Sequence, residues 1–117
     1  MILQESLLLP VPDGLPDDRA ALTEPLAVGL HAVRAARPEA GQVALVAGCG
    51  PIGLAVIAAL KAEGHGPVIA ADYAPARRLM AERLGADVVV DPAASSPYGR
   101  WSDLREPGHH VKIIVRP

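Results

Sequence analysis

The chain contains no phenylalanine and only one cysteine, and both shortages limit how it can fold. Aromatic residues make up 3% of its 117 residues, while hydrophobic residues make up 50%. A core must therefore be built from alanine, valine, leucine and isoleucine, which suits a buried parallel sheet flanked by helices. A single cysteine, Cys49, excludes an internal disulfide and any metal site within the chain that needs two or more thiolates.

Long apolar runs and a basic surface are also missing. No stretch reaches the roughly 18 to 20 apolar residues of a membrane-spanning helix, and the start lacks the basic residues of a signal peptide. We therefore expect a cytoplasmic protein with no membrane contact. The net charge is −2 and the arginines are scattered, which argues against nucleic-acid binding. The length suits one small domain that is part of something larger.

Proline and glycine divide the chain into short elements. Residues 1–17 are proline-rich and should form an extended arm. Residues 18–36 have helical leucine spacing that Pro25 should break or offset in the middle, so we expect two helical pieces rather than one. Four apolar runs predict strands, at residues 42–47, 67–71, 86–90 and 111–115. The patterns between them predict helices at about residues 51–63 and 74–84, and a weaker pattern at 101–106 fits a short helix.

Six residues between the first strand and the next helix form a GxGxxG motif, Gly48-Cys49-Gly50-Pro51-Ile52-Gly53. Unpaired backbone amides at such a helix start attract a pyrophosphate. Gly48 permits the sharp turn, Gly50 lets phosphates approach the backbone, and Gly53 allows the helix to pack closely on the strand. We interpret Cys49 as a small residue that fits this turn, in preference to a reactive thiol. The motif predicts dinucleotide binding.

A carboxylate follows the second strand at the spacing that dinucleotide binding requires. Asp72 lies nineteen residues after Gly53, where an acid can bind the adenosine ribose. Three strands with two intervening helices form a right-handed βαβαβ unit, with the fourth strand on the other side of the first. The sequence therefore predicts an α/β, Rossmann-type three-layer fold. It is partial, with about four parallel strands in the order 3-2-1-4, and a broken helix precedes it.

From about residue 9 to residue 92 the sequence resembles the cofactor domain of the medium-chain dehydrogenase/reductase family, in its zinc-dependent alcohol and polyol branch. The resemblance rests on three linked motifs, which are residues 22–32, residues 46–53, and Ala71-Asp72 followed by Arg77 and by residues 84–87. It implies hydride transfer between a zinc-bound alcohol and NAD. Residues 18–117 would then be a partial NAD-binding domain after an arm at residues 1–17.

The resemblance also assigns cofactor contacts. The three loop glycines match the family's, and Pro51 and Ile52 match the positions whose amides face the pyrophosphate, although only Ile52 has a proton to donate. Asp72 matches the ribose acid, which implies a preference for NAD over NADP because a carboxylate repels a 2′-phosphate. Arg77 matches a basic position that can hydrogen-bond to the ribose. Equally, it could be a solvated helix charge or a partner of Glu82.

No catalytic or metal-binding residue is assigned. Glu24 matches a glutamate near the zinc of polyol-type members, but we favour a surface carboxylate here, since the other ligands are absent. His31 fits a packing or surface histidine, and the pair His109-His110 fits a loop. The implied zinc belongs to the intact family member only, and so does the small alcohol substrate.

Two other functions remain open at this point. An S-adenosylmethionine-dependent methyltransferase also uses a glycine-rich turn and an acid after the second strand, although Pro51 and the Glu24-Pro25 pair argue against it. A non-catalytic nucleotide-binding fragment could complete itself with a partner chain, and an exposed sheet edge would then favour self-association. The resemblance covers neither a substrate domain nor the second half of the sheet, so we expect the chain alone to bind cofactor without turnover.

Overall fold

The computed structural model describes residues 4–99 and 110–114. Its elements, in chain order, are the 3-10 helix η1 (Glu5–Leu7), α1 (Asp17–Ala20), α2 (Thr23–Ala36), β1 (Val43–Ala47), α3 (Pro51–Ala62), β2 (Val68–Ala71), α4 (Pro75–Arg83), β3 (Val88–Val90) and β4 (His110–Ile114). From residue 42 onward these confirm the predicted helices and strands within one or two residues at each end. The exception is the short helix predicted at 101–106, which lies outside the described residues.

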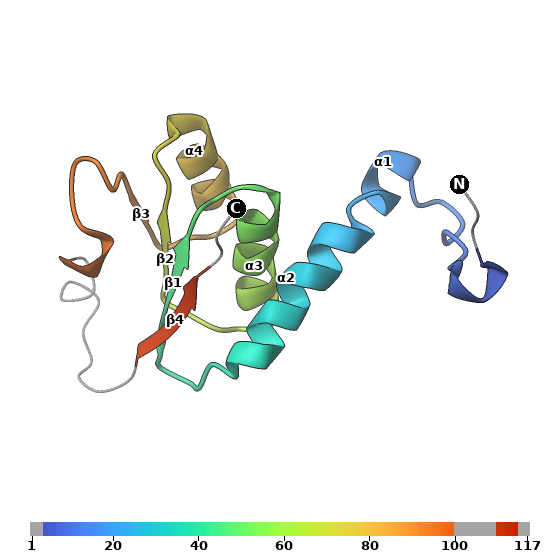
Figure 1. Ribbon diagram of the computed structural model, residues 1–117, viewed down its shortest axis with the longest axis horizontal. Coiled ribbons are helices and arrows are strands. Elements are labelled where there is room, and N and C mark those ends of the chain that lie inside the picture. The colour runs from blue at the N-terminus through green and yellow to red at the C-terminus, as the bar shows by residue number, and fades with distance from the viewer. Residues whose placement is uncertain (1–3, 100–109, 115–117) are drawn as a thin grey trace.

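The four strands form one parallel sheet in the order β3-β2-β1-β4, as the sequence predicts (Figure 1). Leu45 of β1 lies opposite Ile69 of β2 on one side and Lys112 of β4 on the other. The chain order reverses between β1 and β4. In open parallel sheets, ligands bind beside the carboxyl ends of the strands at such a reversal.

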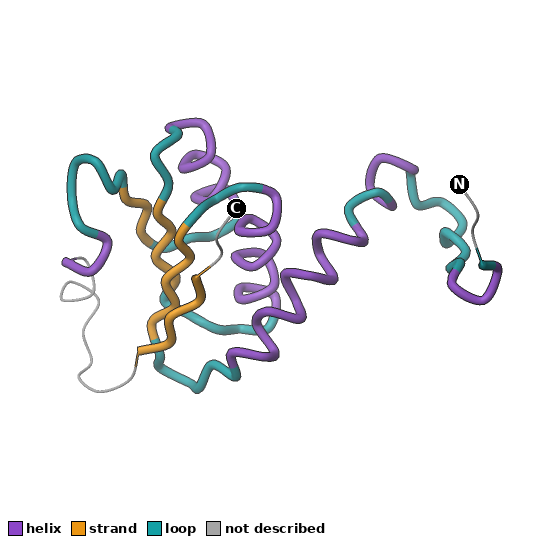
Figure 2. Tube along the Cα trace, viewed as in Figure 1, coloured by secondary structure: helices purple, strands orange, loops and turns teal. Residues whose placement is uncertain are grey.

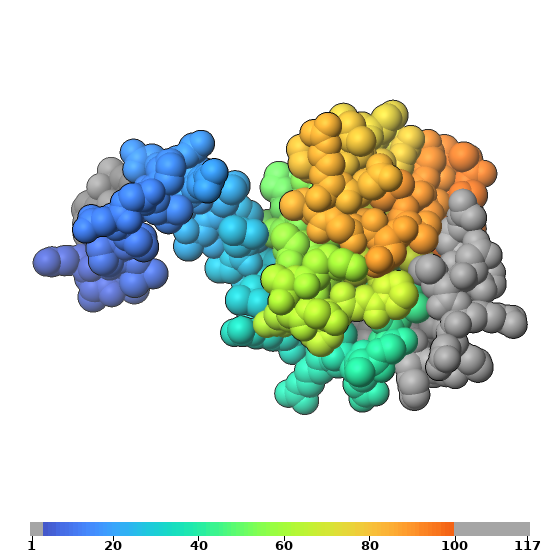
Figure 3. Space-filling model, turned by 180° about the vertical axis from the view of Figure 1, so that it is seen from behind, coloured from blue at the N-terminus to red at the C-terminus, as the bar shows by residue number. Residues whose placement is uncertain are grey.

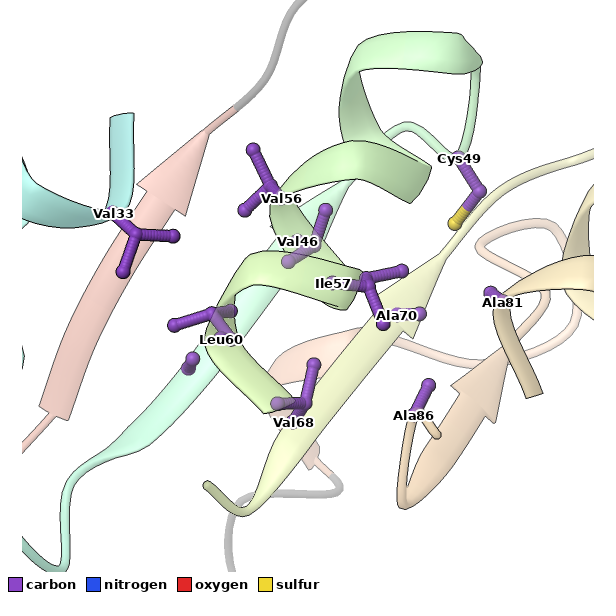
Figure 4. Close-up of a cluster of buried hydrophobic side chains, with 11 residues drawn as sticks. Val33, Val46, Cys49, Val56, Ile57, Leu60, Val68, Ala70, Ala81 and Ala86 are labelled. Carbon is purple, nitrogen blue, oxygen red and sulfur yellow. The ribbon is translucent and has the colours of Figure 1, made fainter. Parts of the chain in front are cut away.

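Helices α2, α3 and α4 lie on one face of this sheet (Figure 2). Their side chains join alternate strand residues in a buried core that includes Val33, Val46, Val56, Ile57 and Leu60 (Figure 4). The other strand residues form a second buried cluster of Val43, Leu45, Ile69, Ala71 and Val90. None of the helices α1 to α4 packs on that second face (Figure 1), so these helices cover one face of the sheet.

Helices α2 and α3 cross closely. A Cβ atom added to Gly29 of α2 would stand 2.6 Å from the backbone carbon of Ala55 in α3, so a side chain at Gly29 would push the helices apart. The predicted break in the first helix exists, but it falls at residues 21 and 22. Pro25 occupies the third position of α2, where the missing amide has no intrahelical acceptor to lose. The expected two pieces are therefore confirmed, but the prediction of a break at Pro25 was wrong.

The N-terminal segment projects from the body of the molecule (Figure 3). Leu7 and Leu9 are 76% and 86% exposed, and apart from η1 the segment is irregular up to α1, as expected for an arm. The expected boundary between residues 17 and 18 falls inside the first turn of α1. None of the helices in the described part of the chain is long and apolar enough to cross a bilayer.

Candidate dinucleotide site at the carboxyl edge of the sheet

The turn between β1 and α3 has the geometry that its glycines require. Gly48 has a φ of +96°, a left-handed conformation that glycine adopts without strain, and its amide donates to the carbonyl oxygen of Ala71 over 2.8 Å. A Cβ on Gly53 would collide with the carbonyl oxygen of Gly48 and stand 2.9 Å from its carbon. The close approach of α3 to this turn therefore depends on glycine at position 53.

The N-terminus of α3 presents amides that the helix itself cannot satisfy. Pro51 is the first helical residue, and the amides of Ile52 and Gly53 precede the first intrahelical donor, Leu54, which bonds to the carbonyl of Gly50 over 2.9 Å. In the described part of the chain no side chain caps this end. A Cβ on Gly50 would meet no atom within 4 Å, so the space beside these donors is open to a ligand. The partial positive charge of the helix end favours an anion there.

Asp72 lies directly beside this turn. The amide of Cys49 donates to its Oδ2 over 2.8 Å, and the amide of Ala74 donates to its Oδ1 over 2.7 Å. The residue is 8% exposed. Burial raises the pKa of Asp72, but the two amides and the nearby charge of Arg77 outweigh that effect, so the pKa is lowered. The carboxylate is therefore held ionised, and each oxygen keeps a lone pair for a further donor.

Arg77 stands on the exposed side of the same carboxylate. Its Nη1 lies 3.7 Å from Oδ2 of Asp72, and its side chain is 56% exposed. The ion pair that this position forms is with Asp72, rather than with the alternative partner Glu82. At such exposure the ion pair alone contributes little to stability.

Arg78, which no sequence motif marks, contacts the backbone of this site. Its Nη1 donates to the carbonyl oxygens of Asp72 and Tyr73, each over 2.8 Å, and lies 3.1 Å from Oδ2 of Asp91. Adjacent arginines in a first helical turn carry no sequence signal that distinguishes them. Asp91 could have been found, because it follows the third strand as Asp72 follows the second.

The thiol of Cys49 is buried in the turn. Burial, and secondarily the charge of Asp72, raise the pKa of Cys49 from 9.0 to about 11. The sulfur lies 3.8 Å from the carbonyl oxygen of Ala71. A thiol that stays protonated and inaccessible is a poor nucleophile, which supports the structural interpretation of this residue.

The other candidate residues are not brought together. Glu24 and His31 are both exposed on α2. His110 begins β4, so its assignment to a loop was wrong, while His109 lies outside the described residues. Across residues 4–99 and 110–114, no group of three or more histidine, cysteine, aspartate or glutamate side chains could hold a metal ion.

A cleft of about 340 Å³ lies elsewhere, lined by Lys61, Gly64, His65, Gly66, Pro67 and Asp87. It is at the amino end of β2, opposite to the glycine turn. Lys61 there already donates to both carboxylate oxygens of Asp87, over 3.2 and 3.0 Å. Because parallel sheets bind ligands at their carboxyl ends, we place the candidate site at the turn and at Asp72.

Comparison with known proteins gives one family and many relatives. The family model described as "Zinc-binding dehydrogenase" matches residues 51–115. The chain is 50% identical over 91 residues to (R,R)-butanediol dehydrogenase of Bacillus subtilis. That match covers 78% of this chain and 26% of the relative. It is 43% identical over 104 residues to L-threonine 3-dehydrogenase of Thermococcus kodakarensis, covering 89% of this chain and 29% of that one.

A solved structure of one such relative has a similar fold. The X-ray structure of 2R,3R-butanediol dehydrogenase from Bacillus subtilis superposes with a TM-score of 0.70 at 48% identity, over 80% of this chain and 26% of that one. The chain thus spans about a quarter of the length of these relatives.

Proposed function

Because this chain belongs to the zinc-binding dehydrogenase family, we propose that it holds the adenosine half of NAD in a zinc-type alcohol or polyol dehydrogenase. One observation carries the proposal. The Asp72 carboxylate, ionised and nearly buried, accepts a hydrogen bond from the glycine turn itself at Cys49. An anion-binding helix end and a ribose-binding acid therefore adjoin each other, and together they match an adenosine diphosphate group. Family membership decides against the methyltransferase alternative.

In this proposal the pyrophosphate lies on the α3 N-terminus. The amides of Ile52 and Gly53 donate to its oxygens, and the open space at Gly50 admits it against the backbone. Gly48 and Gly53 keep the turn tight, and Pro51 begins the helix without losing a bond. The ligand thus satisfies donors that have no intrahelical acceptor.

We further propose that NAD is preferred over NADP. The Asp72 carboxylate would accept from the 2′-hydroxyl of the ribose and would repel a 2′-phosphate, since its lowered pKa keeps it charged near neutral pH. Arg77, beside that carboxylate, is placed to donate to the ribose from the solvent side. Its positive charge would weaken the discrimination without reversing it.

The reaction proposed for the whole protein is hydride transfer between a small secondary alcohol or polyol and NAD. The bound nicotinamide supplies the hydride chemistry, and the residues of this chain bind and orient the adenosine end. No catalytic residue is assigned here. The described residues do not fit the zinc implied by the family, so we derive no step through it and expect cofactor binding without turnover from the 117-residue chain.

Isothermal titration calorimetry tests the proposal. The chain should bind NAD, and Asp72→Ala should weaken binding about tenfold or more, because a hydrogen bond to a charged acceptor is lost. Glu82→Ala, which removes an exposed carboxylate from α4, is the matched control and should bind as the unmodified chain does. NADP should bind more weakly than NAD. A folded chain that binds no NAD would refute the proposal.

Three further assignments belong to the same proposal. We assign residues 18–117 to the NAD-binding domain and residues 1–17 to the arm.

In the described residues β4 pairs with β1 alone, and an edge strand of this kind can pair with another chain. We therefore propose self-association through β4, which sedimentation at rising concentration would test. A cytoplasmic location agrees with the free thiol of Cys49, and cell fractionation would check it.

A further inference from the structure

Arg78 contacts the residues that directly follow two neighbouring strands, β2 and β3. Nη1 of Arg78 donates to the main-chain carbonyls of Asp72 and Tyr73, which follow β2, and lies 3.1 Å from the carboxylate of Asp91, which follows β3. The Arg78 side chain is 19% exposed. The single positive group therefore bridges three oxygens.

Asp91 is itself fixed in place. Its Oδ1 accepts the amide of Ala93 over 2.9 Å, and its carbonyl accepts the amides of Ala94 and Ser95, each over 3.0 Å. The amide of Asp72 also donates to the carbonyl of Val90 over 3.2 Å. The Asp91 carboxylate is therefore a fixed partner for Arg78, and it keeps the Arg78 side chain in position beside the backbone of Asp72.

The backbone and the side chain of Asp72 are held by different groups. The carboxylate is oriented by the amides of Cys49 and Ala74, and the peptide behind it by Arg78. Rotation of that peptide would turn the carboxylate away from the glycine turn. Nη1 carries two hydrogens, which serve the two carbonyls, and its positive charge lies at ion-pair distance from the Asp91 carboxylate.

We propose that Arg78 is a positioning residue for ribose recognition, bridging the Asp72–Tyr73 backbone to Asp91 so that the Asp72 carboxylate stays aimed at the 2′-hydroxyl. This inference rests on the proposed function. The two adjacent arginines then have separate tasks, because Arg77 reaches the carboxylate from solvent whereas Arg78 holds the main chain. Arg78 itself does not touch the ligand.

The test compares two ligands that differ by one hydroxyl, ADP and 2′-deoxy-ADP, by isothermal titration calorimetry on the 117-residue chain. The unmodified chain should prefer ADP about tenfold, and Asp72→Ala should abolish the preference. Arg78→Met should reduce it to about threefold or less while 2′-deoxy-ADP binds as before. Arg83→Met removes a positive charge from the exposed end of the same helix and should keep the preference.

The outcomes separate the two proposals. If Arg78→Met keeps the tenfold preference, or weakens both ligands equally, the positioning role is overturned while the proposed function stands. If the unmodified chain binds neither ligand, or binds both alike, the proposed function itself fails. Circular dichroism shows whether each variant is folded. Should Arg78→Met unfold, Asp91→Asn, which removes only the carboxylate charge facing Arg78, must lower the preference in a folded protein or the inference is wrong.

Discussion

Replacing Gly53 by alanine should destabilise the fold, although alanine is the better helix former by about 1 kcal/mol. The new Cβ would collide with the carbonyl oxygen of Gly48 and stand 2.9 Å from its carbon. Both atoms are backbone, so the strain cannot be relieved by a side-chain rotation, and α3 must move off the turn. That helix carries Val56, Ile57 and Leu60 of the core, each 0% exposed.

The expected cost follows from these contacts. Overpacking of a core costs about 1 to 3 kcal/mol and occasionally more, and a backbone collision belongs at the upper end of that range. After the gain in helix propensity, the free energy of unfolding should fall by about 2 kcal/mol, which lowers the melting temperature of a domain of this size by roughly 10 °C. Urea unfolding followed by far-UV circular dichroism measures the change.

Gly50→Ala is the matched control for this substitution. Gly50 has an ordinary φ of −73°, and its added Cβ meets no atom within 4 Å, so stability should change by about 0.5 kcal/mol or less. NAD affinity should nevertheless fall, because the methyl group enters the space proposed for the pyrophosphate. The reasoning is refuted if Gly53→Ala unfolds at the same urea concentration as the unmodified chain, or if Gly50→Ala is equally destabilised.

Two predictions concern ionisation. The pKa of Asp72 is lowered in the fold, so its contribution to stability is complete above the unfolded-state pKa and is lost as pH falls through the folded one. Asp72→Asn should therefore lose less stability than the unmodified chain between pH 5 and pH 2 in urea titrations, and equal losses would contradict this. The pKa of Cys49 is raised to about 11, so its thiol should resist a disulfide reagent at pH 8 until the chain is unfolded in urea. Rapid labelling of the folded chain would show that the turn is open. The contribution of the raised Cys49 pKa to stability is complete below pH 9 and is lost as pH rises through about 11.

The elements of this fold were predictable because their signals are local. The glycine motif between an apolar run and a helical pattern located the turn, and prolines and glycines marked the ends of helices. Pro25 was the misleading signal, since a proline ends a helix in its interior but is tolerated in its first turn. The actual break at residues 21 and 22 has no proline or glycine to mark it.

The site was predictable in part. The spacing of Asp72 from Gly53 located the acid, but it could not show that the amide of Cys49 binds this carboxylate, because that contact depends on the register of β1 and β2. The contact of Arg78 with Asp91 depends on how α4 packs at the end of β3. Such contacts join residues far apart in the chain, and a single sequence carries no periodic signal for them.

An NMR titration of the 15N-labelled chain with ADP-ribose would locate the bound ligand on the fold. If the glycine turn and Asp72 bind it, the largest amide shifts fall at Gly50, Ile52 and Gly53 on the α3 N-terminus and at Ala74 beside the Asp72 carboxylate. Shifts concentrated instead around Lys61 and His65, at the opposite end of the sheet, would contradict binding at the turn.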